Sequence, residues 1–419
     1  MEGRGAPGHG LLEGKTTGTP IPETVSTGLQ RIAKLAKEAP DRAFLSLAHH
    51  IDMDFLREAY RRTRKGGAVG VDGQTGEEYG RDLEVNLQLL LDRFKSGRYQ
   101  APPVRRVHIP KGDGTQTRPI GIPTFEDKVL QRAVAMVLEA VYEQDFLRCS
   151  YGFRPGRSAH SALANLGYEA MQRGGGWVLE VDIKSFFDSL DRTRLRTILD
   201  KRVRDGVLRR TIDKWLAAGV LEGTELTHPD AGTPQGGVIS PLLANIYLHE
   251  VVDLWFERDV KPVLYGPAFM VRYADDMVMV FSNERDARRL HAVLPKRFGK
   301  YGLVLHPTKT RLVRFTPPSP RHGGRGDGHD RRSFEFLGFV HLWKRSWRRG
   351  TWVVARWTAS SRFSRAVVAL GRWIRTHRHR PVAWQHRELV LKLRGHDNYY
   401  GLGGNETKLA RLRHELGRI

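Results

Sequence analysis

Three aspartates stand out because apolar residues surround them. Asp275 and Asp276 are adjacent in the apolar segment VRYADDMVMVFS, residues 271–282. Asp182 ends the alternating segment WVLEVD, which predicts a buried strand over residues 177–183. Burying a carboxylate costs free energy unless it has a partner. If the strand lies beside the hairpin expected at 271–282, the three carboxylates meet at one edge of a sheet.

Clustered carboxylates suit a hard divalent cation. Their mutual repulsion raises their pKa values and destabilises the fold unless cations share the site. Mg²⁺ takes few carboxylates and completes its shell with water and substrate phosphates. Two such ions, roughly 3.5–4 Å apart, can activate an attacking 3′-hydroxyl and stabilise a leaving pyrophosphate. Taken alone, the Asp275–Asp276 pair is also typical of a turn whose aspartates bond to their own backbone.

The elements before the first aspartate are expected to be mainly helical. Residues 1–28, rich in Gly, Thr and Pro, indicate a flexible tail. A helical pattern runs over 29–94 and is broken by the glycine-rich stretch 66–76. Residues 95–123 contain short extended pieces around the polar turn KGDGTQT. Thr124 is placed to cap a helix that starts at the next residue.

The elements after the first aspartate frame the acidic hairpin. Helical runs are expected up to the glycine-rich loop AGTPQGG at 231–237. Ser240 and Pro241 then favour a helix start, with a cap residue followed by proline. Another helix is expected near 284–301, after the hairpin. Residues 317–333 are rich in Pro, Gly and Arg and indicate a linker or loop insertion.

The composition indicates a polyanionic partner. The formal net charge is +23 at pH 7 and the pI is about 10.3, which favours nucleic acid over a membrane surface. No window is apolar for long enough to span a bilayer, so no membrane contact is expected. The single cysteine, Cys149, excludes an intramolecular disulfide framework and a cysteine-rich zinc site. A reducing, cytoplasmic location is therefore expected.

The C-terminal part is basic and aromatic. Between Glu335 and Glu388 there is no acidic residue, while eleven arginines and six of the nine tryptophans fall there. Arginines interleaved with aromatic residues suit a surface that neutralises phosphates and stacks on bases. The tryptophans can equally form a small core beneath that basic face. The arginines expected to bind RNA are Arg345, Arg348, Arg349, Arg372, Arg375 and Arg378.

A series of ordered motifs runs through the chain. They are VDG (71–73), IPKGDGTQTRPIGIPTFEDKVLQ (109–131), YGFRPGRSAHSAL (151–163), VLEVDIKSFFD (178–188), GTPQGGVISPLLANIYL (232–248), VRYADD (271–276), GLVLHPTKT (302–310), FEFLGF (334–339) and LRGHDNYYGLGGN (393–405). In this order they resemble the bacterial group II intron-encoded reverse transcriptase/maturases, from about Val69 to Asn405. One such block is a weak signal, whereas this many in sequence are highly specific.

The resemblance implies an α/β (α+β) right-hand polymerase with fingers, an antiparallel-sheet palm and a helical thumb. An N-terminal extension and the fingers would occupy 29–175, and the palm 176–342, within a reverse transcriptase domain of about 69–342. A basic, helical thumb or maturase-specific segment would occupy 343–419.

The resemblance also implies an activity. It is RNA-directed DNA synthesis from dNTPs on an RNA template, with a DNA primer or target DNA, under two Mg²⁺ ions for which Mn²⁺ is a substitute. The second implied role is binding of the parent group II intron RNA to assist splicing and retrohoming.

The resemblance assigns roles to the acidic residues and to the nucleotide site. Asp182, Asp275 and Asp276 match the catalytic metal-binding triad, and the carbonyl of Ile183 is a further ligand. The residues that match nucleotide-binding positions are Lys111 and Arg118 for the triphosphate, Phe187 as the bulky gate against a ribose 2′-hydroxyl, and Gln235 beside the incoming nucleotide. From residue type alone, Phe187 can equally be a core phenylalanine, and Lys111 and Arg118 can lie on an ordinary hairpin tip.

The primer and template positions follow in the same way. Lys309 matches a position near the primer strand, and Gly338 lies in FLGF (336–339), which resembles the segment that grips the primer end. On pattern alone FLGF predicts a core strand. Arg154 and Arg157 could contact template phosphates or order their own loop.

One departure from the family pattern concerns the end of the chain. Many relatives continue with a DNA-binding segment and an HNH-type endonuclease carrying paired cysteines. This sequence ends at Ile419 with one cysteine, so no such endonuclease is expected. Two alternatives stay open: a stand-alone reverse transcriptase recruited by the host, for example for defence, and a non-catalytic RNA-binding splicing factor.

Overall fold

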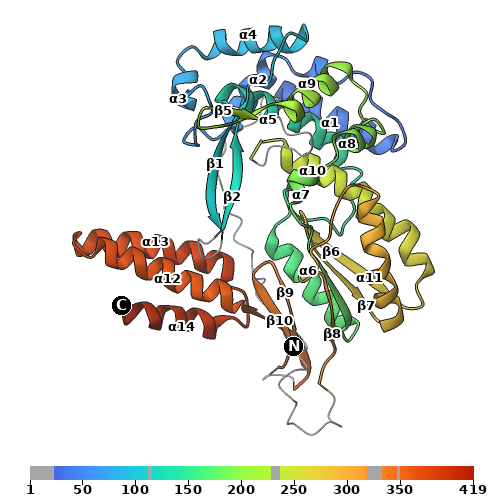
Figure 1. Ribbon diagram of the computed structural model, residues 1–419, viewed down its shortest axis with the longest axis vertical. Coiled ribbons are helices and arrows are strands. Elements are labelled where there is room, and N and C mark those ends of the chain that lie inside the picture. The colour runs from blue at the N-terminus through green and yellow to red at the C-terminus, as the bar shows by residue number, and fades with distance from the viewer. Residues whose placement is uncertain (1–22, 112–115, 228–235, 319–332, 347–349) are drawn as a thin grey trace, which may run out of the picture.

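The protein has the fingers, palm and thumb of a right-hand polymerase, as the α/β prediction requires (Figure 1). The computed structural model describes residues 23–111, 116–227, 236–318, 333–346 and 350–419. Each of the three parts contains its own sheet. The fingers lie at the top of Figure 1, the palm below them, and the thumb to one side.

The fingers combine helices from the first third of the chain with a hairpin. Their helices are α1 (Glu23–Glu38), α2 (Met53–Arg62), α3 (Gly76–Tyr79), α4 (Leu83–Lys95) and α5 (Phe125–Tyr142). Helix α1 begins inside the predicted 1–28 tail, because Val25 and Ile32 on one of its faces are buried. Helix α5 starts directly after Thr124, whose side chain accepts a hydrogen bond from the Asp127 amide, as predicted.

A four-stranded sheet completes the fingers. Its strands, in spatial order, are β2 (Gln116–Ile122), β1 (Val104–Lys111), β4 (Val220–Glu222) and β5 (Glu225–Thr227). The long antiparallel hairpin β1–β2 confirms the extended pieces expected between residues 95 and 123, and it points from the fingers toward the thumb (Figure 1). The short pair β4–β5 was not foreseen from the sequence.

The palm sheet is antiparallel and lies between two cores. Its spatial order is β6 (Ala268–Tyr273), β7 (Asp276–Phe281), β3 (Gly176–Val181) and β8 (Arg311–Phe315). Alternate residues of β7 face opposite sides: Met277 and Met279 join the larger core with helix α11 (Glu284–Gly299), whereas Val278 joins a second core with helix α6 (Ala159–Gln172). Burial on both faces makes these strands apolar throughout.

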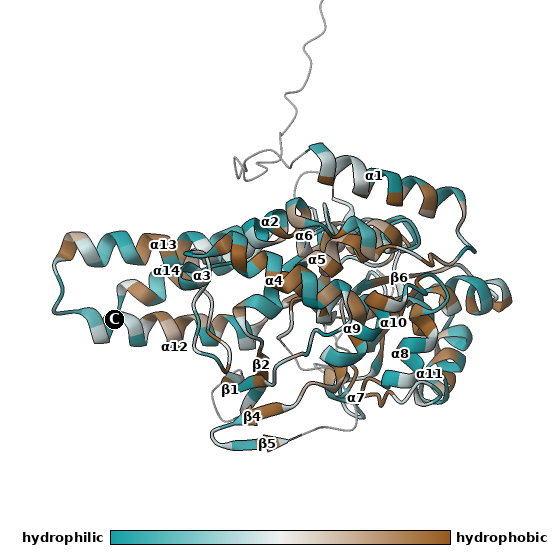
Figure 2. Ribbon diagram, turned by 90° about the horizontal axis from the view of Figure 1, so that it is seen from above, coloured by the Kyte–Doolittle hydropathy of each residue, from teal (hydrophilic) through white to brown (hydrophobic). Residues whose placement is uncertain are grey.

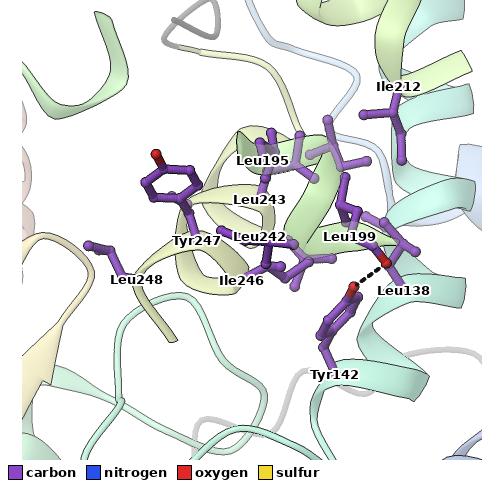
Figure 3. Close-up of a cluster of buried hydrophobic side chains, with 14 of the residues drawn as sticks. Leu138, Tyr142, Leu195, Leu199, Ile212, Leu242, Leu243, Ile246, Tyr247 and Leu248 are labelled. Carbon is purple, nitrogen blue, oxygen red and sulfur yellow. Dashed lines mark hydrogen bonds between the residues drawn. The ribbon is translucent and has the colours of Figure 1, made fainter. Parts of the chain in front are cut away.

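Helices pack between the fingers and the palm. They are α7 (Phe186–Ser189), α8 (Arg192–Leu199), α9 (Gly206–Ala217) and α10 (Ser240–Leu248), with short 3₁₀ turns at Ala48–His50 and Lys261–Val263. Figure 3 shows Leu138 and Tyr142 of α5 beside Leu199 of α8 and Leu243 of α10, with the Tyr142 hydroxyl donating to the Leu199 carbonyl. This shared core fixes the fingers against the palm.

Helix α10 differs from its prediction at its first turn. It begins at Ser240 itself, so Pro241 is its second residue and Ile239 holds the cap position without a side-chain hydrogen bond. Beyond Leu248 the helix continues through wider π-type turns at His249–Asp253 and Phe256–Val260. Such π turns often lie at functional sites. The first of the two carries Asp253, whose carboxylate supports the candidate site described below.

The thumb begins with strands rather than helices. Its sheet orders β11 (Trp352–Thr358), β10 (Phe339–Arg345) and β9 (Ser333–Phe336), and its helices are α12 (Ser360–His377), α13 (Val382–Tyr400) and α14 (Glu406–Gly417). The prediction of a helical segment from residue 343 is therefore wrong up to Ala359. Alternate burial along β10 and the apolar run of β11 favour a sheet there.

The thumb helices are thinly packed. Figure 2 shows apolar and polar residues mixed along α12, α13 and α14. None of the residues of α13 is buried, and only Gly371 is buried on α12. Most arginines of this segment therefore face solvent. In the described ranges, no helix is both long and apolar enough to cross a membrane.

Candidate active site

The adjacent aspartates lie at the turn between β6 and β7. Tyr273 pairs with Asp276 across the hairpin, so Ala274 and Asp275 form its tip. Ala274 adopts a φ of 56°, in the left-handed region that residues other than glycine rarely occupy. Such a conformation persists only when surrounding contacts impose it, and two sets of contacts do so here.

Arg272 holds the turn from beneath. Its side chain is fully buried, and Nη1 donates to the Ala274 carbonyl oxygen at 3.0 Å. The guanidinium also donates to both carboxylate oxygens of Asp253, to Asn245 Oδ1 and to Ser150 Oγ. All of its N–H groups are thereby bonded. The sequence reasoning missed this residue, although a charged side chain inside an apolar strand is a usable signal.

The YGF segment supports the turn from its other side. Asn245 Nδ2 donates to the Gly152 carbonyl at 2.7 Å, and backbone bonds join Cys149 and Tyr151 to Arg272. A Cβ atom on Gly152 would lie 2.4 Å from the backbone nitrogen of Ala274. Only glycine permits this approach. The YGFRPGRS motif thus contributes to the shape of the turn that carries Asp275 and Asp276.

The two arginines of that motif have structural partners. Arg154 is buried and donates to Glu143 and to the carbonyls of Leu147 and Ser150. These contacts favour the loop-ordering role over a template contact, because the buried guanidinium is already bonded to Glu143 and to two backbone carbonyls. Arg157 is half-buried, donates to the Arg148 carbonyl and lies over the Tyr151 ring.

The third aspartate lies on the neighbouring strand. Val181 at the end of β3 pairs with Met277 of β7, so Asp182 and Asp276 leave the sheet at the same edge, as the sequence predicts. Asp182 Oδ2 forms an ion pair with Lys309 Nζ at a distance of 3.2 Å. The next residue, Ile183, is buried and forms an isolated antiparallel bridge with Leu305.

The charges of the three aspartates act on one another. Burial and repulsion from Asp275 and Asp182 raise the pKa of Asp276 to about 6, although this residue is exposed to solvent. Burial also raises the pKa of Asp275, and Asp182 adds to that rise. A cation would relieve this repulsion.

The donor chemistry fits a hard divalent cation, although the aspartates alone do not form a closed metal site. Among the described residues, no three carboxylate, imidazole or thiol groups lie close enough together to hold a metal ion. Mg²⁺ commonly takes only one or two carboxylates, with water and substrate phosphates as its remaining ligands. The carboxylate oxygens, whose repulsion disfavours the charged forms of Asp275 and Asp276, therefore fit such an ion when a phosphate substrate is also bound.

The fingers bring a cation toward the turn. Arg118 is exposed on β2 opposite Ile109, and its charge is among those that lower the pKa of Asp275. Lys111 is the last residue of β1 and pairs with Gln116. The hairpin β1–β2 thus directs both predicted triphosphate-binding residues to the same end of the fingers sheet.

The other predicted nucleotide residues lie nearer the palm. Phe187 is half-buried and its ring lies 5.3 Å from that of Phe186, which is buried in the core as expected. Ser185, just before these rings, has a φ of 47° and turns the chain sharply after Asp182. Gln235 lies outside the described residues.

The FLGF segment forms a turn, not the core strand that its pattern predicts. Leu337 and Gly338, between β9 and β10, have φ values of 51° and 78°. The Tyr399 hydroxyl donates to the Leu337 carbonyl, and the Ala359 amide donates to the Gly338 carbonyl. The phenylalanines on either side are buried, which explains the apolar pattern.

A cleft of about 450 Å³ lies between the aspartates of the palm, the Leu337–Gly338 turn and the start of α12. Palm residues Asp182 and Asp276 line it together with Lys309, the Leu337–Gly338 turn and Arg362 of α12. The cleft therefore has contributions from the palm sheet, the thumb sheet and the first thumb helix. The carboxylates of Asp182, which is half-buried, and Asp276, which is exposed, share this polar cleft with several cations.

The predicted RNA-binding arginines lie away from this cleft or outside the described residues. Arg345 ends β10, and Arg372, Arg375 and Arg378 lie at the C-terminal end of α12, all exposed. Arg348 and Arg349 fall outside the described residues. No ion pair of Arg372 or Arg375 is present in the described part of the chain.

Comparisons with known proteins agree with this architecture. The family model for reverse transcriptases (RNA-dependent DNA polymerases) matches residues 109–341, more than half of the chain. The chain is 39% identical over 237 residues to the group II intron-encoded protein LtrA of Lactococcus lactis subsp. cremoris, covering 56% of this chain and 39% of that protein.

Other relatives share the same region. Protein YkfC of Escherichia coli (strain K12) is 40% identical over 211 residues, covering 49% of this chain and 55% of that protein. Nuclear intron maturase 2, mitochondrial, of Arabidopsis thaliana is 28% identical over 182 residues, covering 34% of this chain and 24% of that protein. The chain thus spans only about two fifths to a half of the first relatives' length.

Proposed function

Because the chain belongs to the reverse transcriptase (RNA-dependent DNA polymerase) family, we propose that it extends a primer 3′-hydroxyl with dNTPs on an RNA template. The observation that carries the proposal is the convergence of Asp182, Asp275 and Asp276 at one edge of the palm sheet. Asp182 raises the pKa values of Asp275 and Asp276, and Asp275 also raises that of Asp276, as expected for carboxylates arranged to share cations.

The three aspartates, with the Ile183 carbonyl, would hold the divalent ions that the family uses, Mg²⁺ or its substitute Mn²⁺. Bound there, two ions would lower the pKa of the primer hydroxyl and neutralise charge on the leaving pyrophosphate. The protein's own part is to hold the carboxylates: Arg272 fixes the turn, and Lys309 balances Asp182.

The fingers would bind the incoming nucleotide. Lys111 and Arg118 would hold its triphosphate, with the guanidinium of Arg118 suited to bidentate contacts. Phe187 would close the space beside the sugar, so that a ribose 2′-hydroxyl finds neither room nor a partner. Gln235 would lie beside the nucleotide. The half-buried state of Phe187 supports a ring available to a substrate rather than one sealed in the core.

The preferred RNA partner would be a group II intron. The names of LtrA and of the Arabidopsis maturase point to intron RNA, and the exposed thumb arginines supply the charge such a partner needs. The protein would then assist splicing and retrohoming in the cytoplasm, binding intron RNA and target DNA. A host-recruited reverse transcriptase and a non-catalytic splicing factor are the alternatives.

Asp275→Asn tests the polymerase proposal. The change keeps the shape of the side chain but removes the charge, so primer extension on poly(rA)/oligo(dT) with Mg²⁺ should fall below detection. RNA affinity should stay nearly unchanged. Asp259→Asn, at an exposed position, is the matched control and should retain synthesis. Retained synthesis in Asp275→Asn would overturn the metal assignment, and a wild-type protein without synthesis would favour the non-catalytic splicing factor.

A further inference from the structure

The first thumb helix takes part in the catalytic cleft. The Ala359 amide bonds to the Gly338 carbonyl, so α12 starts directly against the turn between β9 and β10. Arg362, Arg365 and Ser361 line the cleft together with Asp182 and Asp276. A Cβ atom on Gly338 would lie 3.5 Å from Arg362 Nε, so this guanidinium lies over the turn.

Cations approach the catalytic turn from two sides. Arg118 of the fingers is among the charges that act on Asp275. Lys309 and Arg362 are among those that act on Asp276. The fingers side is the proposed triphosphate site, which leaves the thumb side for a different part of the substrate.

The cations of the cleft differ in whether they are already paired. Arg311 forms an ion pair with Glu180, and Lys309 pairs with Asp182. Within the described residues, neither Arg362 nor Arg365 has a carboxylate at ion-pair distance, and Arg365 Nε donates only to the Ser361 carbonyl of its own helix. Two guanidinium groups thus remain for an anion in a cleft that already holds carboxylates.

The anion that fits this side is a strand of nucleic acid. The 337–338 turn and α12 form one wall of the cleft that Asp182 and Asp276 line, so a primer entering from this side with its 3′-hydroxyl at the aspartates would lay its last phosphodiesters against that wall. We propose that Arg362, assisted by Arg365, binds the phosphodiesters next to the 3′ end of the primer. Guanidinium groups bind phosphate oxygens in bidentate fashion. This inference rests on the proposed function and assigns the start of the basic segment to the polymerase site.

The salt dependence of binding gives the first test. Equilibrium binding of a 5′-labelled DNA primer on an RNA template is measured without dNTPs at several NaCl concentrations. Each lost phosphate contact lowers the slope of log K against log[NaCl] by about one. Arg362→Gln should therefore lower the slope by about one and Arg362→Gln/Arg365→Gln by about two, while Arg362→Lys should retain the wild-type slope.

A matched control removes the same charge elsewhere. Arg289 is exposed on α11, which packs against the palm sheet, and it does not line the cleft. Arg289→Gln should leave the slope unchanged. Circular dichroism and thermal unfolding compare the folding of each variant with that of the wild-type protein. An equal change in Arg289→Gln and Arg362→Gln would mean a general charge effect and would overturn the inference.

Neutral linkages identify the strand. A methylphosphonate that replaces one of the last two primer phosphodiesters should weaken wild-type binding, yet have little further effect on Arg362→Gln. The same replacement in the template strand should weaken both proteins equally. The inference would be overturned if Arg362→Gln instead removed the effect of the methylphosphonate in the template strand and left the effect of the primer methylphosphonate unchanged. Because binding is measured without synthesis, the inference can fail while wild-type extension succeeds, and absent extension would count against the proposed function alone.

Discussion

Arg272 shows how a single residue can set the geometry of the turn that carries the proposed catalytic aspartates. Burial alone would raise the pKa of its partner Asp253, but Arg272 and His249 hold that pKa below its usual value. A buried ion pair of this kind contributes little net stability, whereas removing one partner leaves an uncompensated charge in the interior. The pair is therefore better understood as a device that fixes the Ala274–Asp275 backbone.

Asp253→Asn should impair both stability and catalysis. It leaves the buried Arg272 charge without a counterion, which should cost about 3–5 kcal/mol of unfolding free energy. In the folded fraction, kcat for primer extension should fall more than the KM for dNTP changes, because the carboxylates move while the fingers site stays intact. Urea unfolding and steady-state kinetics measure the two effects.

Two further variants separate positioning from loss of folding. Ser150→Ala keeps the ion pair and removes one hydrogen bond to Arg272, so it should cost only about 1–3 kcal/mol. It should still lower kcat. Glu250→Gln lies on the same π-type turn, where Glu250 pairs with the exposed Lys201, and should have little effect on kcat. A normal kcat in both Ser150→Ala and Asp253→Asn would mean that Arg272 contributes to the stability of the core but does not set the geometry of the turn.

At the scale of elements, the alternation of apolar residues along strands and the capping residues of helices predicted those elements that the local sequence determines. The hairpin at 271–282, the strand before Asp182 and the helix after Thr124 formed as expected. The β4–β5 pair escaped prediction because its strands are three residues long, and β4 is held in the sheet by the distant β1. The site was predictable in its aspartates, whose spacing carries the signal, but not in Asp253 or Arg362, which only folding brings near.

A second buried carboxylate joins the fingers to helix α9. Asp127 on α5 accepts hydrogen bonds from the Tyr99 hydroxyl, from Trp215 Nε1 and from Gln131 Nε2. The side-chain oxygen of Gln131, Oε1, accepts a hydrogen bond from the Ile239 backbone amide just before α10. The network thereby connects α5 and α9 to the end of the glycine-rich loop.

The Asp127 network predicts a pH-dependent stability. Burial raises the pKa of Asp127 to about 6, despite its hydrogen bonds to Tyr99, Trp215 and Gln131. The folded state therefore holds a proton that the unfolded state has lost, so this stabilisation is complete below about pH 4 and is lost as pH rises through 6. The unfolding free energy of the wild type, relative to Asp127→Asn, should fall by on the order of 2–3 kcal/mol over that window.

Urea unfolding of both proteins between pH 4 and pH 8 measures this difference. Asp92→Asn, at an exposed position on α4, should follow the wild-type profile. A difference that stays constant with pH would mean that Asp127 is ionised in the folded protein throughout, and its hydrogen bonds would then outweigh its burial.

At the scale of the whole molecule, α12 connects the two proposed functions. Its first turns line the cleft with Asp182 and Asp276, whereas Arg372, Arg375 and Arg378 lie at its far end, away from the aspartates. The thumb in Figure 1 extends sideways from the palm, so an RNA bound at that end need not block the cleft. Under the two proposals, one basic segment would bind a primer strand and a separate structured RNA.

Replacing Arg372, Arg375 and Arg378 together by Gln tests this division. Affinity for a group II intron RNA should fall, with the salt slope reduced by up to about three, while extension of a short primer–template should stay near wild type. The control Arg285→Gln/Arg288→Gln/Arg289→Gln removes equal charge from α11 and should leave the intron affinity almost unchanged. The affinity for an unrelated RNA of equal length is measured as well. An equal loss of affinity for both RNAs would mean that the three arginines contribute charge alone, and it would favour a host-recruited reverse transcriptase. A maturase must distinguish its intron by shape as well as by charge.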